Sequence, residues 1–290
     1  MNSPIRLVIA GDLHHQAQDR GYLLCSQVLK LWGRFADSKK NLAHCFFQVG
    51  DLIDGYELPD ATKRADLVAA VAALNASPRP VHAIVGNHET YWLPDRAFHL
   101  QALGLPSISR VVEAGPLRIV LFDVTVDNES YGELTSERAA WLADTLSVSP
   151  DKPVIVLQHQ LIHATDEICE HRHYVKNSGE YRRLLEKYQQ VRMIVTGHRH
   201  IPTLTMIGVV PQVTLGAFCS FPFTFAEIVA DKRQAVFREL PLETTFETAD
   251  LTEFQRLLAL SHEGIIKQNR EVWEGRGRMT AELREIVIKW

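Results

Sequence analysis

The sequence predicts a layered α/β fold, and three observations indicate it. Short runs rich in β-branched residues alternate with segments whose apolar residues recur at helical spacing. After residue 203 the pattern changes to successive strands separated by glycine, proline and the Asp231-Lys232 turn. The chain has 290 residues, of which 46% are hydrophobic and 23% charged, so it can bury a sizeable core.

The elements before residue 200 alternate between strand and helix. The predicted strands are residues 7–10, 45–49, 81–85, 119–122, 154–157 and 193–196. The predicted helices are residues 22–35, 61–74, 136–146 and 180–189. We expect Thr135 to cap the third helix, because a side-chain oxygen there accepts a hydrogen bond from an unpaired backbone N–H.

The rest of the chain divides into strands and a helical tail. The successive strands from Leu204 to Glu239 are expected to form a second, antiparallel sheet. From Asp250 onward the apolar residues, Ile286 and Val287 among them, recur at helical spacing. We therefore predict one domain over residues 1–245 and a C-terminal helical extension over residues 246–290. The extension is expected to cover a sheet edge or to close a homodimer.

Charge and hydropathy exclude some partners. The formal net charge is -4, with 31 basic and 35 acidic residues, so no strong positive field is available to hold extended nucleic acid. No run of 18 consecutive apolar residues is present, and the N-terminus does not resemble a signal peptide. We therefore expect no membrane span and a cytoplasmic location.

Five short motifs carry the chemistry, and each follows a predicted strand directly. Ligands collect beyond the carboxyl ends of strands in α/β sheets, so the five motifs are expected to converge. The motifs are Gly11-Asp12-Leu13-His14, Gly50-Asp51-Leu52-Ile53-Asp54, Gly86-Asn87-His88-Glu89, Gln158-His159-Gln160 and Gly197-His198-Arg199-His200.

The residue types in these motifs indicate a catalytic metal site. Carboxylate and imidazole ligands suit manganese, iron and zinc, and the absence of clustered cysteine argues against a structural zinc site. Two divalent ions about 3.5–4 Å apart need a shared anionic ligand to offset their repulsion. Asp51 is the candidate for that bridge.

The five motifs resemble those of the calcineurin-like metallophosphoesterase superfamily, both in their order along the chain and in the positions of their glycines. The resemblance covers the chain from Asp12 to His200. It implies an α/β/β/α sandwich of two mixed sheets flanked by helices, with two divalent transition metals in the site. The implied reaction is hydrolysis of a phosphate ester by in-line attack of a metal-bridging hydroxide.

The resemblance also implies a role for each motif residue. One metal would be held by Asp12, His14, Asp51 and His200, and the other by Asp51, Asn87, His159 and His198. His88 would face the substrate as a proton donor or a stabiliser of charge, and Asp54 would pair with it. The alternatives are that His88 is a further metal ligand and that Asp54 is only a turn residue.

Within the superfamily the chain is most similar to small bacterial phosphodiesterases of the cyclic-nucleotide type. The substrate is then a small phosphate ester, most simply a phosphodiester or a nucleotide. Gly55 stands where Ser/Thr protein phosphatases carry an arginine that grips phosphate, which disfavours that class. The candidate substrate contacts are Arg199, Tyr91 and His163, with Trp92, His171, Arg172 and His173 nearby in the sequence.

Two other functions fit the same motifs. A nucleotide diphosphatase acting on ADP-ribose or CDP-alcohols would use the same ligands, because attack at phosphorus is common to esters and pyrophosphates. A scaffold of this fold that has lost catalysis is the alternative from another class. Every ligand position and the candidate acid are present here, which favours an enzyme.

Overall fold

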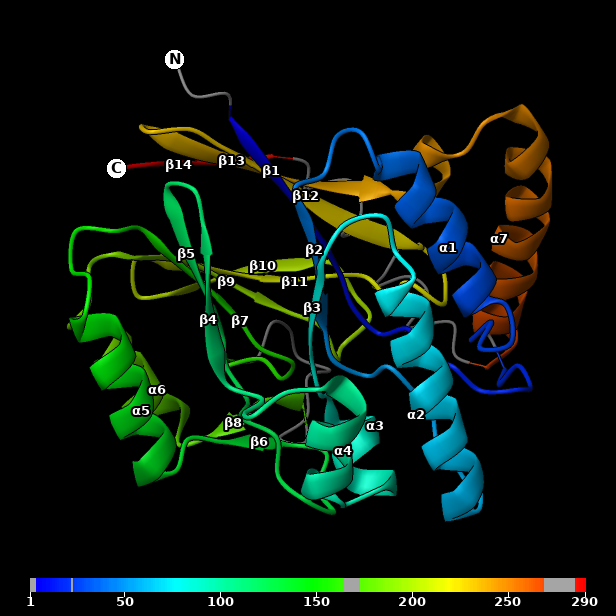
Figure 1. Cartoon of the computed structure of the whole chain (residues 1–290), viewed down its shortest axis with the longest axis horizontal. Helices are drawn as coiled ribbons and strands as arrows, with labels where there is room; N and C mark the ends of the chain where they lie inside the picture. Colours follow the sequence, from blue (N-terminus) through cyan, green and yellow to red (C-terminus); the bar gives the residue numbers. More distant parts are fainter. Residues whose placement is uncertain (1–3, 22, 164–172, 269–284) are drawn as a thin grey trace.

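The computed structural model of the chain describes residues 4–21, 23–163, 173–268 and 285–290. Two six-stranded sheets lie between two groups of helices (Figure 1). One group is α1 (Val28–Lys39), α2 (Asp60–Asn75) and α7 (Thr248–Gln268), and the other is α5 (Ser136–Ser147) and α6 (Ser178–Leu185). The predicted fold class, two mixed sheets flanked by helices, is confirmed.

The first sheet has the strand order β14-β13-β12-β1-β2-β3. Its parallel centre is β1, β2 and β3, whose carboxyl ends carry the first three motifs. The six strands are β14 (Ile286–Lys289), β13 (Gln234–Pro241), β12 (Thr224–Ala230), β1 (Ile5–Ala10), β2 (Cys45–Val49) and β3 (Val81–Ile84).

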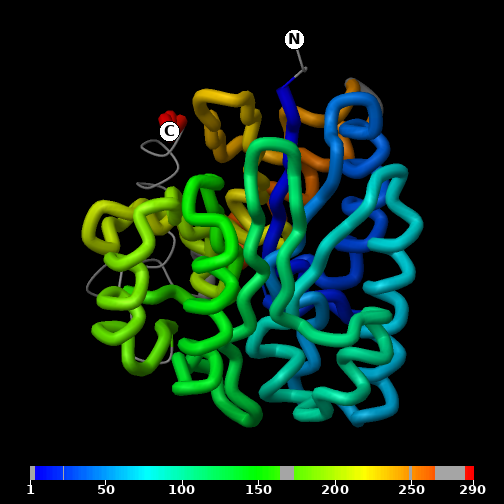
Figure 2. The backbone as a smooth tube through the Cα atoms, turned by 60° about the vertical axis from the view of Figure 1, so that its left-hand side comes forward, coloured from blue at the N-terminus to red at the C-terminus, as the bar shows by residue number. Residues whose placement is uncertain are grey.

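The second sheet has the strand order β10-β11-β9-β7-β5-β4. Its neighbours β7 and β9 are parallel and carry the fourth and fifth motifs. The six strands are β10 (Thr203–Ile207), β11 (Val210–Thr214), β9 (Val191–Thr196), β7 (Val154–Leu157), β5 (Leu117–Leu121) and β4 (Arg110–Ala114). The two sheets and their helices form two halves that face each other when the molecule is turned (Figure 2).

Short elements complete the fold. Two small helices, α3 (Asn87–Trp92) and α4 (Arg96–Leu103), follow β3, and the strands β6 (Gly132–Glu133) and β8 (Val175–Lys176) pair with each other. Thr135 caps α5 as predicted, because its side chain accepts a hydrogen bond from the backbone N–H of Arg138.

Three apolar clusters hold these layers together. The central one lies between the sheets and includes Phe47 of β2 and Leu157 of β7. An outer cluster packs α1, α2 and α7 on the first sheet around Trp32 and Phe254, and another packs α5 and α6 on the second sheet around Tyr181. Because β2 and β7 are buried on both faces, they are continuous apolar runs rather than alternating ones.

The predicted second antiparallel sheet is wrong. β10 and β11 join the second sheet through the parallel pairing of β11 with β9, whereas β12 and β13 join the first sheet through the antiparallel pairing of β12 with β1. The later strands therefore extend both sheets of the sandwich. Alternation along a strand predicts which residues share a face, but it does not identify the neighbouring strand.

The helix predicted over residues 22–35 begins only at Val28. In the preceding segment Leu23 pairs with Arg20 in a local turn, and the backbone N–H of Leu24 makes a long-range hydrogen bond to the carbonyl of Cys219. Leu23 and Leu24 are buried through these contacts rather than through a helical face.

The C-terminal segment also differs from the prediction. α7 ends at Gln268, and Ile286 and Val287 lie in the strand β14, which pairs antiparallel with β13. Ile288 is buried whereas Val287 is half exposed, so the burial alternates as in a strand rather than recurring at helical spacing. The expectation of an all-helical extension is therefore wrong, and the domain boundary at residue 245 stays a prediction.

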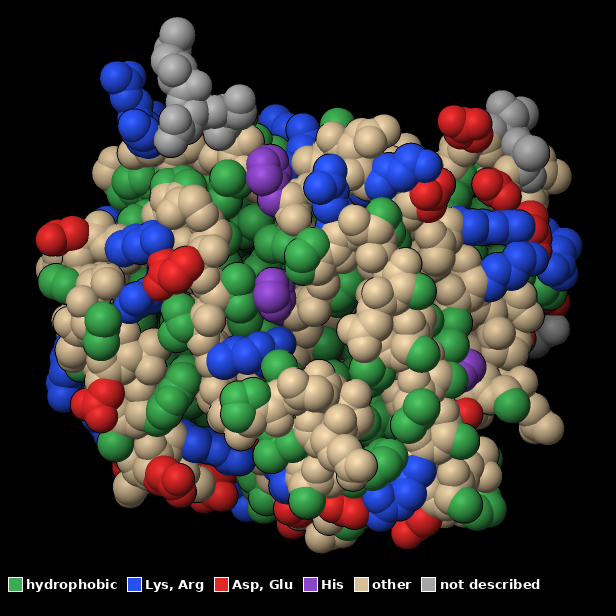
Figure 3. Space-filling model, viewed as in Figure 1, with side chains coloured by type: hydrophobic (Ala, Val, Ile, Leu, Met, Phe, Trp, Pro, Cys, Tyr) green, Lys and Arg blue, Asp and Glu red, His purple; other side chains and the backbone are tan. Residues whose placement is uncertain are grey.

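On the face seen in Figure 3, basic and acidic side chains are interspersed. Within the described parts of the chain, no helix has the length and apolar character needed to cross a membrane.

Candidate metal centre

The loops that carry the first two motifs are joined by backbone hydrogen bonds. The N–H of His14 donates to the carbonyl of Asp51 at 2.9 Å, and the N–H of Asp54 donates to the carbonyl of His15 at 3.2 Å. Because β1 and β2 are parallel neighbours, their loops leave the sheet side by side. The first two motifs therefore lie side by side and line one side of the site.

Five motif residues have a left-handed backbone, which side chains other than glycine seldom adopt. Their φ angles are 58° at Asp12, 49° at His14, 55° at Asp51, 71° at His198 and 58° at His200. Each such residue costs on the order of 1–3 kcal/mol and persists only where the surrounding structure enforces it. Conformations of this kind gather at functional sites, and here all five belong to the candidate metal ligands.

Two motif glycines make room for the carboxylates. A Cβ atom on Gly86 would lie 2.1 Å from Oδ1 of Asp51, and one on Gly197 would lie 2.6 Å from Oδ2 of Asp12. Any side chain at either position would displace a carboxylate. The predicted role of these glycines in aiming their neighbours thus has a steric basis.

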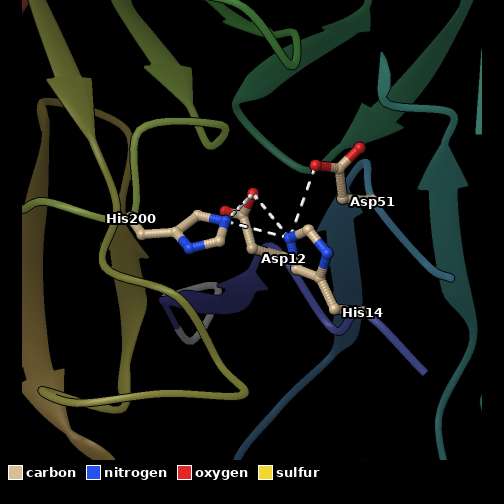
Figure 4. A group of neighbouring side chains, drawn as sticks. All are labelled: Asp12, His14, Asp51 and His200. Atoms are coloured by element: carbon tan, nitrogen blue, oxygen red, sulfur yellow. Dashed lines mark hydrogen bonds and ion pairs between the residues drawn. The ribbon is translucent and has the colours of Figure 1, made fainter. Parts of the chain in front are cut away.

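Asp12, His14, Asp51 and His200 converge on one point (Figure 4). Nε2 of His14 lies 2.9 Å from Nε2 of His200 and 3.5 Å from Oδ2 of Asp51. Nε2 of His200 also lies 3.3 Å from Oδ1 of Asp12. All four side chains are buried, so four potential ligand atoms face one another away from water.

A second group shares Asp51 with the first. Nε2 of His159 lies 3.2 Å from Oδ2 of Asp51 and 2.9 Å from Oδ1 of Asn87. His198 belongs to the same cluster, and its ring centroid is 4.9 Å from that of His159. The structure thus brings together every residue predicted to hold the second metal.

The hydrogen bonds around these groups leave ligand atoms directed inward. Oδ1 of Asp12 accepts the backbone N–H of His198, whereas the buried Oδ2 has no hydrogen-bond partner among the described residues. Nδ1 of His159 lies 2.8 Å from the carbonyl of Val49, so Nδ1–H donates there and Nε2 is the ring atom that faces Asp51 and Asn87 as a potential ligand. The cluster could bind metal ions.

Charge within the cluster controls its protonation. Burial alone would raise the pKa of Asp51, but the neighbouring His159, His88 and His14 hold it well below its usual range. Burial would lower the pKa of His159, but the Asp51 carboxylate beside it raises that pKa to about 9. The carboxylate therefore stays ionised, as a metal ligand must be.

Asp54 connects His14 and His88. Its Oδ1 lies 3.3 Å from Nδ1 of His14 and 3.2 Å from Nδ1 of His88. Burial acts to raise the pKa of Asp54, but the hydrogen bonds from both histidines hold it well below its usual range. Burial acts to lower the pKa of His88, but the charges of Asp51 and Asp54 raise it to about 9.

Glu89 is the last residue of the third motif, and no role was predicted for it. Its buried carboxylate accepts backbone N–H groups from Gly86 at 2.6 Å, Ile53 at 2.9 Å and Asp51 at 3.1 Å. Glu89 thus fixes the loop of the second motif to the start of α3. Its position three residues after Gly86 is that of a capping box, which was the available signal.

The structure describes some of the candidate substrate contacts. Tyr91 is exposed, and its ring packs edge-on against Trp92 beside the motif that carries His88. The backbone N–H of His163 donates to Gln212, and the ring of His173 lies 5.6 Å from that of His198. Arg199 lies within the fifth motif, whereas His171 and Arg172 fall outside the described residues.

The fold and the cluster define an α/β sandwich with a candidate metal site at its strand ends. The model of the calcineurin-like phosphoesterase family matches residues 5–202. The chain therefore belongs to the calcineurin-like phosphoesterase family, as its motifs predicted.

Curated relatives and solved structures agree with this assignment. A probable glycerophosphodiester phosphodiesterase of Arcobacter nitrofigilis is 32% identical over 44% of this chain and 48% of its own length, so the chain spans about half of that relative. A 3',5'-cyclic adenosine monophosphate phosphodiesterase of Vibrio vulnificus is 22% identical over 87% of this chain and 90% of its own. A dimetal phosphatase of Danio rerio has the same fold, with a TM-score of 0.65, 18% identity, and coverage of 83% of this chain and 97% of that one.

Proposed function

We propose that this chain hydrolyses phosphodiesters with two divalent transition metal ions held around Asp51. The observation that supports this best is the position of Oδ2 of Asp51, which lies 3.5 Å from Nε2 of His14 and 3.2 Å from Nε2 of His159. Two cations need a shared anionic ligand, because its charge offsets their repulsion. A single carboxylate oxygen that faces both groups suits this requirement.

The donor set suits manganese, iron or zinc, because all three accept mixed oxygen and nitrogen ligands. When bound, the ions would activate a water molecule and neutralise charge on the phosphate oxygens. One ion would be held by Asp12, His14, Asp51 and His200, and the other by Asp51, Asn87, His159 and His198.

The chain itself would supply the proton for the leaving group. The raised pKa of His88, about 9, keeps its imidazole protonated at neutral pH. Nδ1 of His88 faces Asp54, so Nε2 is the atom that would donate a proton to the leaving oxygen. Asp54 orients this ring without reaching the substrate.

The names of the relatives favour a diester as the substrate, because they are described as glycerophosphodiester and cyclic-nucleotide phosphodiesterases. The sequence supports the same choice, since Gly55 replaces the arginine with which Ser/Thr phosphatases hold a monoester. Substrate contacts by Tyr91, His163 and Arg199, a homodimer closed through the C-terminal segment, and a cytoplasmic location stay predictions.

The proposal is tested by metal analysis together with kinetics. The purified protein is stripped with a chelator, reloaded with Mn²⁺ and analysed for bound metal. We expect about two ions per chain, and faster hydrolysis of bis(4-nitrophenyl) phosphate than of 4-nitrophenyl phosphate. Absence of specific metal uptake would contradict the metal centre, and a monoester preference would contradict the diester assignment.

A further inference from the structure

Arg20 lies at the edge of the candidate site, and none of the five motifs contains it. We infer that Arg20 is a specificity-determining residue that binds a second anionic group, carried by the leaving group of the substrate. The inference rests on the proposed function and narrows its substrate class.

An ion pair holds Arg20 beside the proposed proton donor. Nε of Arg20 lies 2.9 Å from Oδ2 of Asp54, the carboxylate whose other oxygen faces His88 and His14. The Asp54 side chain is fully buried, whereas that of Arg20 is 37% exposed. The guanidinium therefore extends from the solvent to the buried Asp54 carboxylate, which His88 also contacts.

A second contact places the guanidinium over an aromatic ring. Its Cζ atom lies 4.7 Å from the centroid of the Tyr56 ring. Tyr56 is itself held, because its ring packs edge-on against Trp92 at a centroid distance of 5.3 Å. The ion pair with Asp54 uses Nε, so the Nη1 and Nη2 N–H groups of Arg20 are the donors that a ligand would meet.

The aromatic residues around Arg20 belong to the segments that carry His88 and Asp54. His88 and Trp92 are on the same short helix, α3, and Tyr56 follows Asp54 by two residues. In the inferred binding mode, a leaving group that takes its proton from Nε2 of His88 extends toward the row formed by Tyr56, Trp92 and Tyr91. Arg20 stands at the Tyr56 end of that row.

Asp54 offsets the charge of Arg20 only in part. The Asp54 carboxylate contacts Arg20, His14 and His88. Its single negative charge is divided among these three partners and does not fully neutralise the positive charge of the Arg20 guanidinium. A carboxylate or phosphate that accepts two hydrogen bonds in a plane matches the remaining guanidinium donors. In a cyclic nucleotide the leaving oxygen stays tethered to the same phosphate, so no separate charged leaving group departs. The inferred substrate is therefore an open diester or pyrophosphate with a charged leaving group.

Three synthetic diesters test the inference. Methyl phenyl phosphate, methyl 3-carboxyphenyl phosphate and methyl 3-phosphonophenyl phosphate release phenols that differ chiefly in the added anion. For the metal-loaded wild type we expect kcat/KM to be about ten-fold higher with at least one charged leaving group, the size of a hydrogen bond to a charged group. The two charged diesters show whether carboxylate or phosphate is preferred.

The variants separate recognition from catalysis. Arg20→Gln should abolish the preference for the charged leaving group, Arg20→Lys should keep part of it, and Arg79→Gln, at an exposed arginine, should keep all of it. If a substitution of Arg20 disturbs His88 through Asp54, kcat/KM changes alike for the three diesters. The ratio of kcat/KM between a charged diester and the uncharged one is then unaffected. An equal ratio in wild type and Arg20→Gln would overturn this inference alone, whereas no hydrolysis of any diester by the metal-loaded wild type would overturn the proposed function with it.

Discussion

Nδ1 of His88 lies 3.2 Å from Oδ1 of Asp54 and 2.5 Å from the backbone carbonyl oxygen of the same residue. With both contacts on one nitrogen, Nδ1–H is the donor and the ring is held in a single orientation. Nε2 of His88 is then directed toward Asp51, whose Oδ2 lies 4.0 Å away. His88 therefore lies beside the proposed bridging ligand, and it forms with His14 and Asp54 a further group that could hold a metal ion.

We expect His88→Ala to keep its bound metal and to lose catalysis. General acid catalysis is worth roughly 10²–10⁴-fold, so kcat with an alkyl ester should fall by about that factor. The loss should be smaller with a nitrophenyl ester, whose leaving group needs less protonation, and Asp54→Asn should reproduce part of it. Metal content and kcat for both esters are measured in each variant. Loss of metal in His88→Ala would instead identify His88 as a ligand.

Asp51→Asn should weaken binding at both metal positions. The amide has no negative charge to offset the repulsion between two divalent ions, and Oδ2 of Asp51 faces both His14 and His159. Titration of the stripped protein with Mn²⁺ measures the stoichiometry and the affinity. Asp144→Asn, at an exposed position of α5, is the matched control. Unchanged binding of two ions by Asp51→Asn would show that this carboxylate is not shared.

Glu89→Gln should destabilise the loop of the second motif. The carboxylate accepts three backbone N–H groups, and a glutamine amide would turn an N–H donor toward at least one of them. A buried unsatisfied donor costs about 1–3 kcal/mol, so urea denaturation should show a loss of that size. Glu137→Gln, on the exposed face of α5, should change the free energy of unfolding by less than about 0.5 kcal/mol. Equal stability of the two variants would contradict the role of Glu89.

Glu239 should make the stability of the protein fall as the pH rises. Burial raises the pKa of this carboxyl from 4.5 to about 7, although Thr224 and the backbone N–H of Gly216 donate to its Oε1 atom. The folded protein then binds the proton more tightly than the unfolded chain does. The stabilisation is therefore complete below about pH 4.5 and is lost as the pH rises through 7.

The corresponding change in the free energy of unfolding is up to about 3 kcal/mol between pH 4 and 8. Glu239→Gln removes the titration, so the difference in stability between wild type and variant should change with pH by about that amount. Urea midpoints at several pH values measure it. A difference that does not vary with pH would show that Glu239 titrates normally.

The sequence by itself determined the layered α/β fold, the family and the residues that form the cluster. Each motif follows a short apolar run, and the carboxyl ends of neighbouring parallel strands lie at one edge of a sheet. The convergence of residues as distant as Asp12 and His200 was therefore predictable from local patterns. Gly86 and Gly197 were equally predictable, because glycine marks the places where the backbone must approach closely.

Only the tertiary structure decided how the later strands pair and which side chains surround the cluster. β12 lies beside β1 and β11 beside β9 because long-range pairing depends on the whole sandwich, whereas periodicity in a sequence fixes only the face of a strand. Ile286 and Val287 were predicted to be helical, yet they lie in β14 because β13 offers an unpaired edge. Arg20 and Glu89 also contact residues more than 30 positions away, and although Glu89 stands in a capping-box position, no local pattern encodes these distant partners.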